Sequence, residues 1–405
     1  MAECASLAAD VVVVGGGPAG SVTALLLARA GFSVLLVERR QFPRAKPCGD
    51  CLSPAANRIL TRIGVMPDVL RAGPALLEGW QLIAPDGSAF HARFNDISSD
   101  PLDDTALALR RDVFDRVLLD HAQAAGARIM HDVQVTDVLR HADGAVAGVR
   151  ARWYDQPVLI ESRLTVGADG LRSIIARRLR AHARRPRLRK ASFTVHVTHD
   201  SDSRMGEMRV AAGACLGIAP VEAGNGPRTH NFTLVVNGRV LATRAGSRTI
   251  LREGLRTFGI AADIEGAEIL ASGPFDWPVR NIVVDGAALV GDAAGYYDPF
   301  TGEGIYHALA GAELLAEQAS AALARPRADR AALRTYAAAH RRLTRPARRV
   351  QRMIEFVCAR PRLANLAFRR IGRRPDIARA LVGVTGDIMS PRSLISPRLL
   401  MGLVT

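Results

Sequence analysis

The chain has 405 residues, enough to bury a sizeable core and to form about two or three domains. No segment reaches the roughly 20 apolar residues of a membrane span, the start lacks the basic and apolar regions of a cleavable signal, and five scattered cysteines form no disulfide framework. The formal net charge of +15 is almost all arginine. We therefore expect a cytoplasmic protein in a reducing compartment, and exclude the integral membrane and disulfide-rich secreted classes.

The opening of the chain predicts a β-α-β unit. A β-branched strand at 10–14 leads into a glycine-rich turn at 15–20, and small and apolar residues at 21–30 suit a buried helix. A second strand at 33–37 ends at Glu38. The turn fits G-x-G-x-x-G and Glu38 follows about 20 residues later, as a dinucleotide-binding fingerprint requires.

Each part of this fingerprint has a physical role. Gly15 would permit the tight turn, Gly17 would let a pyrophosphate approach the backbone, and Gly20 would let helix and strand pack closely. Amides at the helix start would face the phosphates. Glu38 would accept hydrogen bonds from the ribose hydroxyls, and its charge would repel the 2′-phosphate of NADP. The residues assigned to this part of the site are Gly15, Gly17, Pro18, Ala19, Gly20, Glu38 and Arg39.

Further along the chain, predicted strands and helices alternate with short motifs. We expect short strands from 76 to 94, a helix from 111 to 126, and a strand at 164–166 that leads into Gly-Ala-Asp-Gly at 167–170. The segment 192–273 is mostly strand, a short buried strand at 287–290 ends in Gly-Asp at 291–292, and a long helix runs from 302 through 315. The chain after about residue 329 is expected to be helical.

Four stretches, in this order, resemble the geranylgeranyl reductase family within the flavoproteins built like p-hydroxybenzoate hydroxylase. They are the N-terminal fingerprint, 42–50 (FPRAKPCGD), 111–115 (RDVFD), and 291–294 (GDAA) continuing through 299–305 (PFTGEGI). The resemblance reaches to about residue 320, is loose in the strand-rich middle and hardly extends into the C-terminal tail. It implies that the dinucleotide is FAD.

The resemblance also implies roles for individual residues. Arg111 would reach the FAD diphosphate, Asp292 would hold a hydroxyl of the ribityl–phosphate arm, and amides at Gly302 and Gly304 would approach the flavin N1–O2 edge. A reduced flavin is anionic at N1, and a helix N-terminus stabilises that charge. Taken alone, Arg111 could be a surface arginine and Asp292 a helix N-cap. The cofactor-binding residues assigned in this way are Arg111, Asp169, Gly291, Asp292, Gly302, Gly304 and Ile305.

Three residues are candidate catalytic residues: Cys48, Tyr297 and Glu303. Cys48 belongs to the family pattern KPCGD, and with Cys51 it also forms C-x-x-C, which could be a dithiol or half a zinc site. No second pair completes a zinc site, so we expect no metal. Tyr297, like His307, could position a substrate, donate a proton or simply pack the helix. Glu303 lies between the two glycines near the predicted N1–O2 edge.

The arginines from 341 to 374 are interleaved with apolar residues. Such a basic amphipathic surface could lie on anionic membrane, peripheral to its inner face, where a lipid-tailed substrate would be found. It could also be a solvated helical face packed on the flavin domain. Nucleic-acid binding is not expected, because no binding fold or stacking motif accompanies the charge. The preference for arginine could reflect an anionic partner or only a GC-rich genome.

The predicted fold class is α/β: a Rossmann-like FAD-binding domain, an inserted β-rich substrate domain and a C-terminal helical segment. The FAD-binding domain takes residues 1–75, 101–175 and 274–328. The substrate domain takes 76–100 and 176–273, and the helical segment takes 329–405.

The expected chemistry is hydride transfer through flavin N5. The first hypothesis is reduction of carbon–carbon double bonds in an apolar, isoprenoid-like substrate, because Gly-Glu-Gly at 302–304 favours the reductases over hydroxylases, which more often carry Gly-Gln-Gly. One alternative is an FAD-dependent monooxygenase that acts on an aromatic or polyketide ring. Another is a non-catalytic lipid- or quinone-binding flavoprotein.

Several features leave the substrate and the electron donor open. Leu216 and Gly217 stand where many members of the family carry an aromatic pair before a proline. The W-x-W-x-I-P motif of flavin-dependent halogenases is absent, which argues against halogenation. No second dinucleotide fingerprint occurs, so NAD(P)H would bind transiently or electrons would come from a carrier protein.

Overall fold

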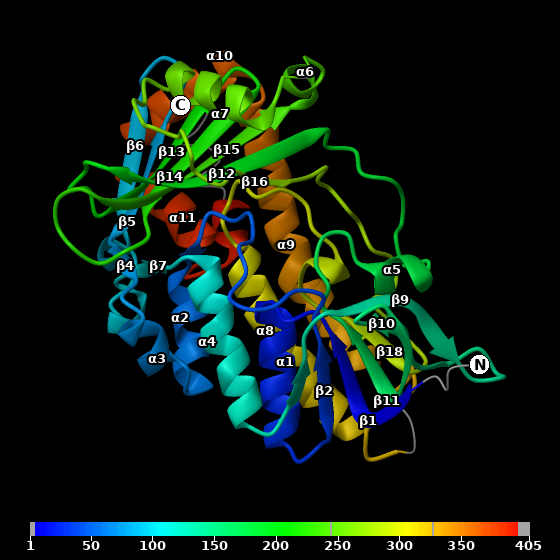
Figure 1. Ribbon diagram of the computed structural model, residues 1–405. Coiled ribbons are helices and arrows are strands. Elements are labelled where there is room, and N and C mark those ends of the chain that lie inside the picture. Colours follow the sequence, from blue (N-terminus) through cyan, green and yellow to red (C-terminus); the bar gives the residue numbers. More distant parts are fainter. Residues whose placement is uncertain (1–4, 244, 326–327, 396–405) are drawn as a thin grey trace.

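The structure is a computed structural model that describes residues 5–243, 245–325 and 328–395. In these residues it shows a sheet with a parallel centre, a mainly antiparallel sheet and a small third sheet, with helices packed around them (Figure 1). The predicted α/β fold class is confirmed. The last ten residues of the helical segment predicted at 329–405 lie outside the described residues.

The first sheet has eight strands in the described residues, five of which run parallel. Its strands are β17 (Val283–Val284), β18 (Ala287–Leu289), β11 (Gln156–Gly167), β1 (Ala5–Val14), β2 (Val34–Val37), β8 (Arg128–Met130), β9 (Val133–Arg140) and β10 (Val146–Trp153). One side of it is packed by helices α1 (Pro18–Arg29), α4 (Arg111–Ala124) and α8 (Gly304–Ala322) (Figure 1). The valines of β1 are fully or almost fully buried, as β-branched residues in a central parallel strand should be.

The register of the parallel strands brings three sequence motifs to one edge. Val14 pairs with Val37 on one side and with Gly167 on the other, and Gly167 pairs with Leu289. The carboxyl ends of β1, β2, β11 and β18 are therefore level. The glycine-rich turn, Glu38, the Asp-Gly motif and the Gly-Asp motif all follow these ends, at the edge where open α/β sheets bind ligands.

The second sheet has seven strands in the described residues. They are β16 (Leu270–Ser272), β12 (Lys190–His199), β15 (Arg228–Asn237), β14 (Ala214–Pro220), β13 (Met205–Ala211), β5 (Gly79–Ile83) and β6 (Ala89–Arg93). Helix α7 (Ser247–Thr257) packs its apolar residues on one face. Sequence analysis expected mostly strand here, and α7 was missed because its apolar positions Ile250, Leu251 and Leu255 are embedded between strand-like segments.

The remaining elements are a small third sheet and short helices. The third sheet is formed by β3 (Cys51–Leu52), β7 (Ala106–Ala108) and β4 (Ala75–Leu77). The short helices are α2 (Pro54–Arg62), α3 (Met66–Arg71), α5 (Ile174–Arg178) and α6 (Gly238–Leu241). The division of the chain into the three parts given above stays our proposal.

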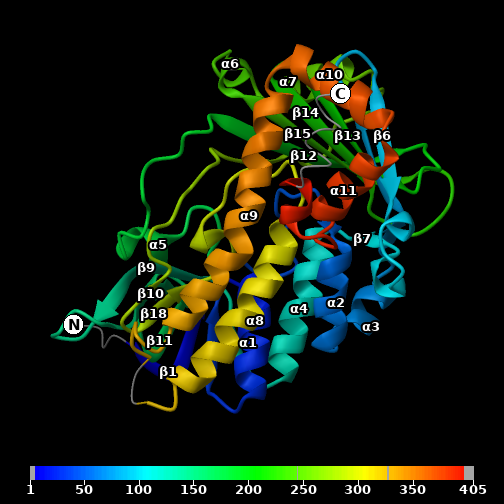
Figure 2. The ribbon, with the colours of Figure 1, turned by 180° about the vertical axis from the view of Figure 1, so that it is seen from behind.

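The C-terminal helices connect the two large sheets. They are α9 (Arg334–Cys358), α10 (Pro361–Gly372) and α11 (Pro375–Thr385), and α9 runs along the back of the molecule from the first sheet to the second (Figure 2). Lys190 of β12 joins them to the sheet, because its Nζ lies 2.5 Å from Glu355 of α9 and 3.0 Å from Asp298. Within the described residues, no helix combines the length and the apolar character that a bilayer span requires.

Candidate functional site

The glycine-rich turn has the backbone that its sequence predicts. Gly15 has a φ of +105°, and a Cβ there would lie 2.6 Å from the Ala168 carbonyl oxygen. At Gly20 a Cβ would lie only 1.8 Å from the Gly15 carbonyl oxygen, so helix α1 and strand β1 can pack this closely only with glycine. Helix α1 begins at Pro18, and the amides of its first turn are free to face an anion.

Gly17 differs from these two glycines because the position that a Cβ would take there is empty. The atoms nearest to a Cβ built there are two guanidinium nitrogens, Nη2 of Arg44 at 3.6 Å and Nη2 of Arg111 at 3.9 Å. Both arginines are largely buried, and Nε of Arg44 has no hydrogen-bond partner among the described residues. A helix N-terminus with two arginines beside an open cradle fits a pyrophosphate.

Glu38 and Arg111 are held by the protein itself. The Glu38 carboxylate accepts the backbone amides of Gly16 at 2.9 Å and Arg40 at 3.1 Å. Arg111 makes a two-point ion pair with Asp115, at 2.6 and 2.7 Å, which fixes its guanidinium at the start of α4. The ribose role of Glu38 and the diphosphate role of Arg111 stay predictions.

Most of the other residues assigned to cofactor binding line one cavity, and two of them, Asp169 and Arg39, do not. A cavity is lined by Pro18, Ala19, Arg111, Gly291, Asp292, Gly302, Gly304 and Ile305, together with Gly17. Asp169 instead caps helix α5, because its carboxylate accepts from Ser173 Oγ and the Ile174 amide, and only its neighbours line the cavity. Arg39 is exposed and lies outside the lining.

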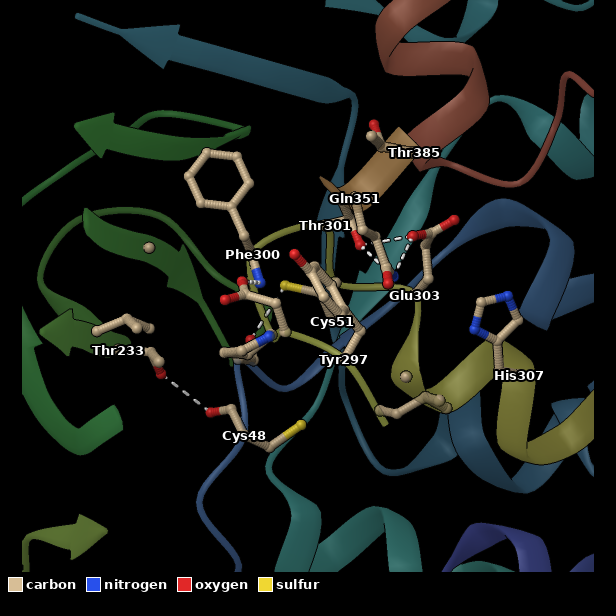
Figure 3. A pocket seen from close by; sticks show the side chains of 18 of the residues that line it. Cys48, Cys51, Thr233, Tyr297, Phe300, Thr301, Glu303, His307, Gln351 and Thr385 are labelled. Carbon is tan, nitrogen blue, oxygen red and sulfur yellow. Dashed lines mark hydrogen bonds between the residues drawn. The ribbon is translucent and has the colours of Figure 1, made fainter. Parts of the chain in front are cut away.

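The Cys48 segment is tied to the second sheet. The Cys48 carbonyl oxygen accepts from Asn231 Nδ2 at 2.7 Å and Thr233 Oγ1 at 3.1 Å (Figure 3). Asp50, which is fully buried with a φ of +58°, accepts from Asn231 at 2.6 Å. These bonds hold the segment between the cofactor cradle and the sheet.

Both cysteines of the C-x-x-C pair are free thiols that line the cavity. Burial raises the pKa of the Cys48 thiol, with a smaller lowering effect from Arg111. Burial and Asp50 raise the pKa of Cys51, whose Sγ donates to the Gly49 carbonyl oxygen at 3.1 Å. At neutral pH both are therefore protonated thiols, the less nucleophilic form of cysteine.

Tyr297 and Glu303 lie on the loop that separates the cradle from the rest of the cavity. Tyr297 lines the cavity, and the guanidinium carbon of Arg352 stands 5.6 Å from its ring centre. Glu303 is 3% exposed, and its Oε2 accepts from Thr301 Oγ1 at 2.5 Å and Gln351 Nε2 at 2.8 Å (Figure 3). Helix α9 therefore reaches the predicted N1–O2 edge.

Beyond this loop the cavity continues as an apolar space between the second sheet and the C-terminal helices. Its walls are apolar side chains from both sides: Trp80, Leu82, Phe90, Met208, Ile218, Phe300, Met353, Ile354, Phe368, Ile371, Ile377 and Leu381. Met353 lines the cavity and is also 45% exposed, so the space reaches the surface at α9. Gly217 lies in the wall and Leu216 faces the core under α7.

Sequence reasoning missed two parts of this site. Arg44 stands inside the quoted motif FPRAKPCGD and could have been found as a basic residue close to the glycine turn. The apolar wall from α10 and α11 had no motif, because those helices contribute single residues spaced by helical turns.

Comparisons with known proteins agree with this geometry. Residues 8–353 match a family described as FAD binding domain. The chain is 32% identical over 313 residues to a digeranylgeranylglycerophospholipid reductase of Methanothrix thermoacetophila, which covers 74% of each chain. It is 29% identical over 352 residues to a menaquinone reductase of Mycolicibacterium smegmatis, which covers 76% of each.

One solved structure with this fold is a triple mutant of the flavin-dependent brominase Bmp2. Its TM-score is 0.78 at 20% identity, and the match covers 96% of this chain and 98% of that one. At this identity the likeness shows the fold alone. The predicted resemblance to geranylgeranyl reductases is confirmed by the relatives.

Proposed function

This chain belongs to the FAD binding domain family and is an FAD-dependent oxidoreductase, and from that premise we propose that it reduces carbon–carbon double bonds in an apolar, isoprenoid-like substrate. The observation that carries the proposal is the continuous cavity, which begins at the phosphate cradle beside Gly17 and ends among apolar side chains of the C-terminal helices. The relatives named for a lipid and a quinone support the same class of substrate.

Residues at one end of this cavity would bind FAD, and residues at the other end would bind the substrate. Arg44, Arg111 and the start of α1 would hold the FAD pyrophosphate, and Gly302 and Gly304 would bring backbone amides to the N1–O2 edge. When bound and reduced, FAD supplies a hydride. The apolar walls would align a chain-like alkene and exclude water, while Cys48 and Tyr297 would contact the substrate where the two halves of the cavity meet. NAD(P)H as a transient electron donor stays part of the proposal.

The deciding experiment is an anaerobic single turnover of the reduced holoenzyme with a polyprenyl alkene, followed by mass spectrometry. We expect a product heavier by two hydrogen atoms. No product without oxygen, and a gain of one oxygen atom with it, would instead assign a monooxygenase. A flavin that is reduced but never yields a product under either condition would assign a non-catalytic binding protein.

The two cysteines provide a matched pair in the same assay. Cys48→Ser should slow product formation, because Cys48 lies beside Arg111 at the junction of the cavity. Cys51→Ser should form product at a rate near that of wild type, because the Cys51 thiol already donates a hydrogen bond to the Gly49 carbonyl oxygen. An equal loss in both variants, with a disulfide formed on oxidation, would support a dithiol instead.

We also propose peripheral contact with an anionic membrane at α9 and α10. Phe356, three residues after Met353 on α9, is 55% exposed, Leu366 of α10 is 46% exposed, and the guanidinium of Arg360 covers the Phe356 ring. Exposed apolar side chains among arginines are suited to a lipid headgroup boundary.

Vesicle co-sedimentation tests this contact. The wild type should bind vesicles that contain anionic phospholipid more strongly than neutral ones, and salt should weaken the binding. Phe356→Ser should reduce binding by at least about tenfold, since burying a Phe side chain is worth roughly 1.5–3 kcal/mol. Leu70→Ser, at a 51% exposed residue of α3, is the control and should bind like wild type. Equal binding to neutral vesicles would contradict the proposal.

A further inference from the structure

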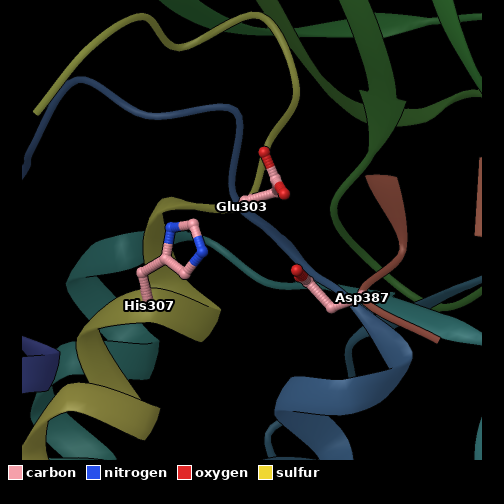
Figure 4. Close-up of side chains that lie close together, drawn as sticks. All are labelled: Glu303, His307 and Asp387. Atoms are coloured by element: carbon pink, nitrogen blue, oxygen red, sulfur yellow. The ribbon is translucent and has the colours of Figure 1, made fainter. Parts of the chain in front are cut away.

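Three polar side chains meet at the inner end of the loop before α8. Glu303, His307 and Asp387 place a carboxylate or ring nitrogen atom within 4.8 Å of one another (Figure 4). Glu303 immediately precedes α8, His307 lies in the first turn of that helix, and Asp387 follows α11 with a φ of +60°. The fold therefore brings the C-terminal segment into contact with the predicted N1–O2 edge.

The two carboxyl groups have few compensating partners. Glu303 Oε2 accepts hydrogen bonds from Thr301 and Gln351. Asp387 Oδ2 accepts a hydrogen bond from Ser53 Oγ at 3.0 Å. Among the described residues, no arginine or lysine makes an ion pair with either carboxyl group, and no donor reaches Glu303 Oε1. Glu303 is buried and Asp387 is half-buried, and two carboxylates so close together at such a site cannot both be ionised without a cost.

The pKa values of Glu303, Asp387 and His307 decide which of the three side chains carries a proton at neutral pH. Burial raises the pKa of Glu303, and burial together with Glu303 raises the pKa of Asp387 well above its ordinary range. Burial and Arg348 lower the pKa of His307 to about 4. His307 is therefore neutral at neutral pH and cannot balance the carboxylates, so the balancing proton belongs to the carboxyl pair.

The pair also spans a wall between two cavities. Glu303 and His307 line the cofactor and substrate cavity. Asp387 lines a second cavity on the other side, with Arg62 and Tyr306, and the Arg62 side chain is 60% exposed there. Tyr306 and His307 are successive residues of α8 that face opposite sides of this wall. Water thus has access to Asp387, and the cofactor cavity has access to Glu303.

We propose that Glu303 and Asp387 form a proton-delivery pair that takes protons from the outer cavity and releases them at the Glu303 carboxyl group into the cofactor cavity. This inference rests on the proposed function. Saturating an alkene breaks its π bond and forms two C–H bonds, one from the hydride that reduced FAD supplies, recharged by an external two-electron donor, and one from a proton. Glu303 gives that proton, Asp387 passes its own to Glu303 through a bridging water, and water in the outer cavity protonates Asp387 again.

A first test uses the FAD-loaded protein without substrate. Infrared spectroscopy should show the C=O band of a buried protonated carboxyl group in wild type, and in Asp387→Asn this band should disappear at a lower pH, because Glu303 then lacks its negative neighbour. A group with a raised folded-state pKa stabilises the fold below its unfolded pKa and loses that contribution as pH rises through the folded pKa. The free energy of unfolding should accordingly fall less at high pH in Asp387→Asn than in wild type.

Side chains from several helices and loops face Glu303 and Asp387 and influence their titration. The pair faces Thr301 and His307 at the start of α8, Gln351 from α9 and Ser53 before α2, while Tyr306 and the Arg62–Glu313 ion pair face it from the outer cavity. Of these, Glu313 is already paired with Arg62 and His307 is neutral. Burial also raises the pKa of Asp169, so the difference between the carboxyl bands of wild type and Asp387→Asn reports on the pair. Flavin absorbance and melting temperature verify that each variant is loaded and folded.

The second test is the rate of anaerobic single turnover. Asp387→Asn should slow product formation on the order of 10²-fold, as expected on loss of a general acid, and the remaining rate should depend on pH where wild type does not. Glu317→Gln, an exposed carboxylate of the same outer cavity, is the control and should react like wild type.

Three results would overturn the pair: no protonated carboxyl band at neutral pH in wild type, an unchanged titration in Asp387→Asn, or stoichiometric binding of Mn²⁺ or Zn²⁺ that Asp387→Asn abolishes, which would make the trio a metal site. A product that gains oxygen rather than hydrogen would overturn the proposed function alone, because the infrared and stability measurements need no substrate.

Discussion

Gly17→Val should yield a folded protein that retains no FAD. A Cβ at this position meets no protein atom closer than 3.6 Å, and the backbone, with φ −78° and ψ −177°, is extended and accepts a β-branched residue. The valine methyl groups would instead fill the space between Arg44 and Arg111 that the pyrophosphate needs. Flavin absorbance after gel filtration measures the loss, and circular dichroism shows whether the fold persists.

The chain offers a closely matched control for this variant. Gly246 is also the N-cap of a helix, with φ −64° and ψ 154°, and a Cβ there meets nothing within 4 Å. Gly246→Val should therefore suffer the same loss of capping, about 1 kcal/mol, and still retain FAD. Full retention of FAD by Gly17→Val would show that the cradle is not the phosphate site.

Gly217→Phe should abolish turnover of long-chain substrates and leave FAD bound. Gly217 lines the cavity in β14, and the atoms nearest to a Cβ there are Met208 Cε at 3.6 Å and the Thr233 carbonyl oxygen at 3.9 Å. The strand therefore accepts a side chain, and β-propensity favours an aromatic one. The ring would occupy the space in which an extended apolar chain is expected to lie.

Single-turnover rates with short and long alkenes would measure this change. We expect loss of the long-chain reaction by at least about two orders of magnitude, corresponding to roughly 2.7 kcal/mol, with a much smaller effect on a short alkene. Gly217→Ala adds one methyl group at van der Waals distance and is the control. Unchanged long-chain turnover in Gly217→Phe would place the substrate elsewhere.

The cofactor half of the site was predictable because its signals are local. The turn at 15–20, Glu38 and Gly291-Asp292 each follow a strand directly, and parallel pairing makes the ends of those strands meet. Spacing along the sequence therefore translates almost directly into position in space. Arg44 was available in the same way and was simply assigned no role.

The carboxyl pair could not be found by such reasoning. Glu303 and Asp387 are separated in sequence by four complete helices, α8 to α11, and their contact depends on how α11 docks under the second sheet. That docking is decided by many small apolar contacts around Phe90, Ile371 and Ile377, none of which forms a motif. Helix α7 was missed for a related reason, since its amphipathic pattern is short.

The position of the C-terminal helices has a consequence for how the protein is made. The apolar strand residues that line the cavity, such as Leu82 and Phe90, are synthesised well before Phe368 and Ile377, which cover them. Until the last helices leave the ribosome, one face of the second sheet stays uncovered in water, and exposed apolar surface of this kind promotes aggregation during synthesis. The ion pair of Lys190 with Glu355, which ties α9 to β12 of the second sheet, can form only after α9 has been synthesised.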